Sequence, residues 1–107
     1  MILRNARLIF PDGTRDGLEV EARNGKITAI RADSGSPVRE QLDLGGNYLA
    51  PGFIDLHVHG ALGHDAMDAS MDAFGAICRH HASGGTTSLL LTTATAPMAA
   101  LVKVFKM

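Results

Sequence analysis

Two histidines separated by one residue, His57 and His59, are the side chains of this sequence best suited to chemistry. Side chains of an extended strand alternate between its two faces, so residues two apart project to the same side. Two neutral imidazoles on one rigid strand can hold a divalent cation such as zinc. The spacing therefore predicts a metal site at His57 and His59, and ordinary core packing of both rings is the alternative.

Other polar residues lie close to this pair in the sequence. Asp55 falls on the same face of the predicted strand, and we expect it to orient the histidines rather than to bind the metal, as carboxylates near metal-bound imidazoles often do. His64 and Asp65 follow on a loop and are interpreted as solvated loop residues. Cys78 has no base beside it in the sequence, so we predict no catalytic nucleophile within the chain.

The segment that carries the histidines reads as the start of a parallel α/β arrangement. Residues 53–59 predict a buried strand whose outer face is apolar, with Ile54, Leu56 and Val58. A loop follows to residue 69, Ser70 can cap a helix, and Gly84-Gly85 can end it. Residues 86–95 predict a second buried strand, and Pro97 suits the first turn of another helix.

The preceding part of the chain reads as a small antiparallel β unit. Its predicted strands are Ile2–Phe10, Leu18–Arg23, Lys26–Arg31 and Gln41–Leu44. Asn24-Gly25 joins two of them and is a strong signal for a tight hairpin, because both residues tolerate positive φ. We place the domain boundary at the glycine pair 45–46, which gives one domain over residues 1–46 and another over 47–107.

Composition places the chain among globular proteins. Apolar residues make up 46% of its 107 residues, charged residues 20%, and the formal net charge is -1. No cluster of Lys or Arg predicts a nucleic-acid partner or an anionic membrane surface, and no apolar run is long enough for a membrane span. The lone Cys78 fits a reducing compartment, so we expect a soluble, cytoplasmic protein.

The run P-G-F-I-D-L-H-V-H over residues 51–59 resembles the first barrel strand of the amidohydrolase superfamily. That resemblance implies the start of a metal-dependent hydrolase (β/α)8 barrel preceded by part of a small β-sandwich. H-G-A-L-G-H-D over residues 59–65 and G-G-T-T-S over residues 84–88 look like the N-acetylglucosamine-6-phosphate deacetylase family.

The resemblance implies a reaction and its participants. In the family, a metal-bound water removes the acetyl group of N-acetylglucosamine 6-phosphate, giving glucosamine 6-phosphate and acetate. It implies that His57 and His59 help to bind a divalent metal, with zinc expected, and that the natural partner is a small amino-sugar phosphate. We also expect a homo-oligomer.

The chain is short for this family, because a (β/α)8 barrel needs about 200 residues or more. The family's glutamate ligand, its two later histidines and its catalytic aspartate would all come after Met107. The resemblance therefore implies a truncated N-terminal portion with no catalytic residue of its own, weak metal binding and no turnover.

Two alternatives remain open at this point. One is another amidohydrolase, of the dihydroorotase or deaminase type, although a dihydroorotase-like site would carry an arginine soon after the histidines, where Gly60-Ala61 stand. The other is a non-enzymatic β-rich domain that binds a metal or a partner through the same strand.

Overall fold

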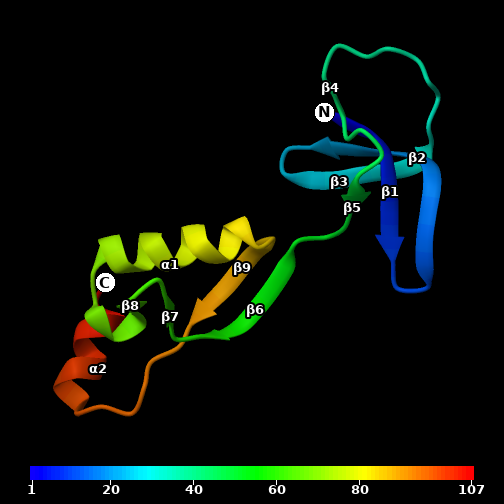
Figure 1. The fold of residues 1–107 in the computed structure, drawn as a ribbon. Helices are drawn as coiled ribbons and strands as arrows, with labels where there is room; N and C mark the ends of the chain where they lie inside the picture. Colours follow the sequence, from blue (N-terminus) through cyan, green and yellow to red (C-terminus); the bar gives the residue numbers. More distant parts are fainter. The chain divides into compact units, whose positions relative to one another are not determined.

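The computed structural model describes residues 1–107 and divides them into two compact units, Met1–Pro51 and Gly52–Met107 (Figure 1). The sequence predicts a domain boundary after Gly46. The compact units divide after Pro51, because the short strand β5 (Tyr48–Leu49) pairs with β1 (Ile2–Phe10) of the first unit.

The first unit is one mixed sheet, in which β1, β2 (Gly13–Arg23) and β3 (Lys26–Ala32) form two antiparallel hairpins. The strand order is β3-β2-β1-β4, and β5 also pairs with β1. Both β4 (Gln41–Asp43) and β5 run parallel to β1. The prediction of a purely antiparallel unit is therefore wrong for β4 and β5, because the connection after β3 carries the chain back to the start of β1.

The predicted hairpin turn between β2 and β3 is confirmed, since Asn24 and Gly25 have φ values of 51° and 74°. β2 begins at Gly13, earlier than the predicted Leu18, because Thr14 and Arg15 continue the pairing with the end of β1. The sequence pattern did not show this extension, because residues 13–17 have no apolar alternation.

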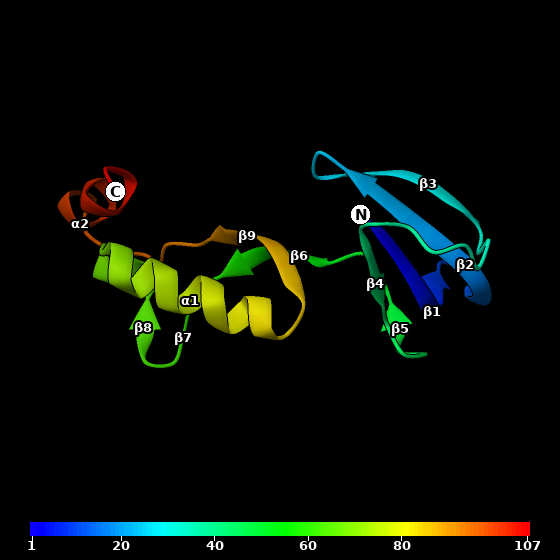
Figure 2. The same ribbon diagram turned by 90° about the horizontal axis from the view of Figure 1, so that it is seen from above.

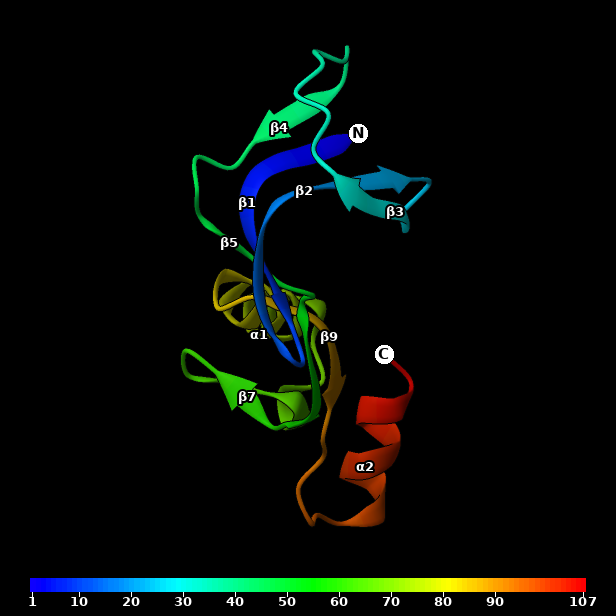
Figure 3. The same ribbon diagram turned by 90° about the vertical axis from the view of Figure 1, so that its right-hand side faces the viewer.

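The core of the first unit is small and is formed by side chains of β1 and β2, two paired strands that curve together (Figure 3). Ala6, Leu8 and Val20 are its buried members. The register of β1 against β2 shifts on either side of Ala6, and Asn5 has a positive φ of 53°. Such a bulge bends a strand and increases its twist, which lets β1 wrap around this core.

A buried ion pair adjoins the core. The Arg4 Nη2 and Glu19 Oε2 atoms lie 2.9 Å apart, and the two residues are only 8% and 1% exposed. Arg31 donates from Nε to the other Glu19 oxygen at 2.8 Å. The alternation of L-E-V-E-A-R suggests outward-facing glutamates, so Glu19 departs from that pattern because two arginines neutralise it inside the unit.

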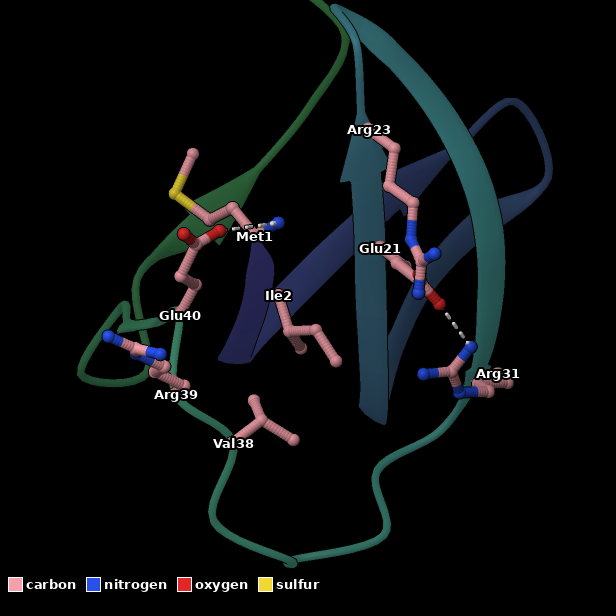
Figure 4. Close-up of a pocket in the computed structure, with 8 residues that line it drawn as sticks. All are labelled: Met1, Ile2, Glu21, Arg23, Arg31, Val38, Arg39 and Glu40. Atoms are coloured by element: carbon pink, nitrogen blue, oxygen red, sulfur yellow. Dashed lines mark hydrogen bonds and ion pairs between the residues drawn. The ribbon is translucent and has the colours of Figure 1, made fainter.

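Next to this pair, Glu21 accepts hydrogen bonds from Arg31 and Arg23. The three side chains form one wall of a cavity of about 640 Å³, with Ile2 and Val38 across from them (Figure 4). The hydrogen bonds from Arg31, and secondarily Arg23, hold the pKa of the Glu21 carboxyl below its ordinary value.

Asp43 closes the turn that leads from β4 to β5. Its Oδ1 atom accepts from the Gly45 backbone N–H at 2.7 Å and from the Asn5 side-chain amide at 2.7 Å. These two donors, with Gly45 the stronger, lower the pKa of the Asp43 carboxyl. In β5, the Tyr48 ring lies under the Arg7 guanidinium, whose carbon is 5.9 Å from the ring centroid.

We expect the first unit to lose stability as the solution is acidified below about pH 5. Glu21 and Asp43 both have folded pKa values below their unfolded ones, so each stabilises the fold above its unfolded pKa. That contribution disappears as the pH falls through the folded pKa. Urea denaturation at a series of pH values measures the loss. Asp43→Asn should show a shallower dependence on pH, and identical slopes for the two proteins would contradict this role of Asp43.

The second unit is built on the parallel pair of β6 (Phe53–Val58) and β9 (Thr86–Leu91), connected by α1 (Met71–Ser83). A small hairpin of β7 (Gly60–Ala61) and β8 (His64–Asp65) follows β6, and α1 packs on β9 and on this hairpin (Figures 1 and 2). This strand–helix–strand order confirms the predicted α/β class.

The ends of the helices follow local sequence signals. Ser70 caps α1 as predicted, with its hydroxyl oxygen accepting from the Ala73 N–H at 3.2 Å. The helix ends at Gly84, whose N–H returns to the His81 carbonyl. A 3-10 turn, η1 (Ala66–Asp68), precedes α1, and α2 (Met98–Phe105) starts directly after Pro97.

Both strands of the second unit are more exposed than the sequence suggests. Ile54, Leu56 and Leu90 are 70%, 68% and 59% exposed, and β9 ends at Leu91 rather than at residue 95. The prediction of two buried strands is wrong for this chain, because each strand has one neighbouring strand and α1 packs on β9 but not on β6. None of the helices has the length and apolar character needed to cross a bilayer.

Candidate metal centre

The end of β6 brings His57 and His59 together. Their Nε2 atoms lie 3.0 Å apart, and the ring centroids are 4.9 Å apart with an interplanar angle of 73°. Both residues are exposed, and Val58 between them is buried. The two imidazoles therefore leave the same side of the strand, as the alternation of strand side chains predicts.

The spacing of the two nitrogens fits one shared cation. Zinc–nitrogen bonds of about 2.05 Å at the tetrahedral angle separate two nitrogens by about 3.3 Å. The observed 3.0 Å separation of the Nε2 atoms needs only a small opening of the rings to reach that value. Neutral imidazoles are the form that binds metal. The pair can therefore supply two nitrogen ligands of a divalent ion.

Two backbone hydrogen bonds hold this strand end in place. The Val58 carbonyl accepts from the Thr92 N–H at 2.7 Å, just beyond β9, and the His59 carbonyl accepts from the Ala66 N–H at 2.7 Å. The buried Val58 side chain adds a third anchor. Because ligands on a fixed backbone lose little conformational freedom on binding, these anchors preorganise the histidine pair.

Asp55 lies two residues before His57 in β6, and it makes no hydrogen bond to either imidazole. Its Oδ1 atom accepts from the backbone N–H of His57 at 3.0 Å. The carboxylate is half-buried in the middle of β6. The expectation that Asp55 orients the histidines therefore takes a different form in the structure, since its contact is with the backbone of His57 rather than with its ring.

The interpretation of Asp65 as a solvated loop residue is wrong, because its carboxylate caps η1. Asp65 Oδ1 accepts from the Met67 N–H at 2.7 Å, and Asp68 Oδ2 accepts from the Asp65 N–H at 2.9 Å. The D-x-x-D spacing of this capping box was the signal that could have revealed it. His64 is exposed, with Nδ1 3.8 Å from Asp68 Oδ2, so it stays outside the histidine pair.

The structure brings no third metal-binding side chain to His57 and His59. No group of three or more His, Cys, Asp or Glu residues is arranged to hold a metal ion. A catalytic zinc normally has three protein ligands and one water. Within residues 1–107, His57 and His59 are therefore the two candidate nitrogen ligands that the structure brings together.

Comparison with known proteins gives this geometry a context. The chain is 40% identical over 85 residues to the N-acetylglucosamine-6-phosphate deacetylase of Vibrio furnissii. This match covers 79% of the chain and 21% of that protein. It is 35% identical over 100 residues to the N-acetylgalactosamine-6-phosphate deacetylase of Escherichia coli O157:H7, covering 94% of the chain and 26% of that protein.

Comparison of the fold with solved structures also finds similarity to a deacetylase. The crystal structure of N-acetylglucosamine-6-phosphate deacetylase from Pasteurella multocida matches 98% of this chain and 28% of its own, with a TM-score of 0.87 and 29% identity. This chain is similar to the N-terminal part of N-acetylglucosamine-6-phosphate deacetylases. It spans about a quarter of the length of the deacetylases it matches.

The similarity to the deacetylases is wider than the histidine motif. Both compact units are covered by the structural match, because it extends over nearly the whole chain. Dihydroorotases match over 60 residues or fewer, and an allantoinase of Streptomyces avermitilis is 38% identical over 92 residues. The L-hydantoinase structure from Arthrobacter aurescens covers 98% of the chain with a lower TM-score of 0.59. No family model matches the sequence.

Proposed function

We propose that this chain supplies His57 and His59 to a divalent metal centre, with zinc as the metal, in a deacetylase of amino-sugar phosphates. The proposed substrate is N-acetylglucosamine 6-phosphate, and the products are glucosamine 6-phosphate and acetate. The observation that carries the proposal is the 3.0 Å approach of the two Nε2 atoms at the end of β6. The similarity to N-acetylglucosamine-6-phosphate deacetylases over 79% of the chain supports the substrate.

In this role the chain binds the cation and orients the two histidine ligands, and none of its residues transfers a proton. His57 and His59 would hold the cation, while Val58 and the hydrogen bonds to Thr92 and Ala66 fix their backbone. When bound there, a divalent ion would supply an acidified water and Lewis-acid polarisation of the acetamide carbonyl. The general base and the further ligands lie outside residues 1–107, so we propose that the isolated chain has no turnover.

Several broader features belong to the same proposal. The parallel β6–β9 pair with its connecting helix is proposed as the opening of a (β/α)8 barrel, and the first unit as part of a small β-sandwich. The exposed Ile54, Leu56 and Leu90 support the expectation that the chain self-associates. The single free Cys78 supports a cytoplasmic location.

A chimaeric enzyme tests the proposed function. In it, the matching N-terminal segment of the Vibrio furnissii deacetylase is replaced by residues 1–107 of this chain. We expect zinc-loaded chimaera to release acetate from N-acetylglucosamine 6-phosphate. His57→Ala and His59→Ala should each lower kcat/KM by more than about a hundredfold, beyond the effect typical of residues that only support metal ligands.

The controls separate the alternatives. His80→Ala removes an exposed imidazole of α1 and should leave acetate release unchanged. Residues 1–107 alone, supplied with zinc, should release no acetate. Full activity of the chimaera that lacks both His57 and His59 would reject the metal centre. Faster turnover of N-acetylgalactosamine 6-phosphate would shift the substrate to that epimer, which the Escherichia coli relative's name favours.

A further inference from the structure

We infer that Asp55 is a positioning residue, whose carboxylate fixes the backbone of His57 and thereby keeps the two imidazoles convergent. The inference rests on the proposed metal centre, which it deepens by naming the group that supports one of its ligands. The contact that carries it is the 3.0 Å hydrogen bond from the His57 N–H to Asp55 Oδ1.

The pairing of β6 with β9 shows why His57 needs such a support. Asp55 is opposite Leu89, but the next paired residues are Val58 and Leu91. Between these pairs β6 advances three residues while β9 advances two, which offsets the opposite shift between Phe53 and Ile54. Such an irregularity interrupts the regular ladder hydrogen bonds of the strand. His57 lies in this irregular stretch.

Asp55 accepts the hydrogen bond of the His57 N–H within this irregular stretch. Backbone N–H groups that lack a partner cost free energy unless water reaches them, and a free donor lets the local φ and ψ change. In β6, the Asp55 side chain spans two residues and closes a small ring onto the His57 N–H, as Asp does in local side-chain turns. The ring holds the backbone of residues 55–57 in one conformation.

The direction of the His57 ring depends on that conformation. A strand that slips by one residue moves its side chains to the opposite face. Val58 is pinned from the other side by the Thr92 N–H and by burial of its side chain. Without Asp55, the backbone between residues 55 and 58 is free to rearrange, and His57 loses its alignment with His59. The Asp55 side chain accepts from the backbone N–H of His57, so the amide oxygen of an asparagine can replace the carboxylate in this hydrogen bond.

The test uses the 107-residue chain and three variants. Asp55→Ala removes the acceptor, Asp55→Asn keeps an acceptor oxygen without the charge, and Asp72→Ala removes an exposed carboxylate from the first turn of α1 as a matched control. The first measurement is hydrogen exchange of the His57 amide by NMR without metal. We expect about tenfold faster exchange in Asp55→Ala, because the His57 N–H then has no acceptor at position 55. Asp55→Asn and Asp72→Ala should stay close to the wild type.

The second measurement is the zinc dissociation constant of the same four proteins, by competition with a chromogenic chelator. We expect Asp55→Ala to raise it about tenfold, as loss of a ligand-supporting residue does, and Asp55→Asn to leave it nearly unchanged. If Asp55→Asn weakened zinc binding as much as Asp55→Ala does, the inference would be overturned. Zinc affinity would then depend on the negative charge of Asp55 and not on its contact with the backbone. Unchanged His57 exchange in Asp55→Ala would overturn it too.

These outcomes distinguish the inference from the proposed function. A wild-type chain that binds no zinc would reject the metal centre, whereas the exchange of the His57 amide would still report on the Asp55 contact. If Asp55→Ala fails to fold, Asp55→Asn alone decides the matter, because an amide at position 55 that accelerates exchange at His57 contradicts the proposed hydrogen bond.

Discussion

Glu19→Ala is expected to lower the free energy of unfolding of the Met1–Pro51 unit by about 3 kcal/mol. The substitution removes the carboxylate that pairs with Arg4 and leaves the buried guanidinium charge without that partner. Arg4 is 8% exposed and keeps only the Ser36 carbonyl at 2.9 Å and Asp33 at 3.6 Å. A unit whose core has three buried apolar side chains has little stability to spare. Urea denaturation measures the change.

Two further variants give this expectation its control. Asp16→Ala breaks the ion pair between Asp16 and Arg7, two side chains that are each more than half exposed. It should lower the free energy of unfolding by less than about 1 kcal/mol. The double variant Arg4→Met with Glu19→Leu removes both buried charges and should recover most of the loss. Equal effects of Glu19→Ala and Asp16→Ala would show that burial of the pair has no energetic consequence.

Gly60→Ala is expected to disrupt the strand end that carries the histidine pair. A Cβ atom at position 60 would lie 2.1 Å from the backbone carbonyl oxygen of His64 and 3.1 Å from Asp65 Cα. Because backbone atoms cannot turn aside as a side chain can, the β7–β8 hairpin has to open. We expect a cost of about 3 kcal/mol for the second unit and at least tenfold weaker zinc binding.

Gly75→Ala is the matched control for this substitution. A Cβ at Gly75 would meet the end of the Arg79 side chain at 3.0 Å, which can move away. Gly75 lies inside α1, where alanine is favoured over glycine by up to about 1 kcal/mol. The two glycine substitutions should therefore have opposite signs in thermal unfolding followed by circular dichroism. A stable Gly60→Ala protein with unchanged zinc affinity would refute the close approach of the two backbones.

The convergence of His57 and His59 could be predicted from the sequence, because it depends only on the two-residue repeat of a strand. The same holds for the Ser70 cap and the Asn24-Gly25 turn, which are local. That these rings bind a metal stays a prediction, since no third ligand from this chain lies beside them. That Asp55 supports His57 could be expected from its position, but its contact with the backbone rather than the ring depends on the irregular register of β6 against β9, which the sequence does not show.

Features that depend on contacts between distant parts of the chain could not be predicted from the sequence. The alternation in β2 suggests that Glu19 faces solvent, and only the position of Arg4 on the neighbouring strand explains its burial. The parallel pairing of β4 and β5 with β1 is likewise set by the path of the connection, and no local pattern encodes it. The apolar runs in β6 and β9 indicate burial, but they do not reveal what covers those strands.

The place of Tyr48 in β5 has a consequence for spectroscopy. The chain has one tyrosine and no tryptophan, and that tyrosine lies in the first unit against Arg7. Tyrosine absorbance and emission therefore report on the first unit alone, while the unit that carries the histidines has only the weaker signals of its phenylalanines. Melting curves recorded by tyrosine emission and by amide circular dichroism should separate wherever the two units lose their structure independently.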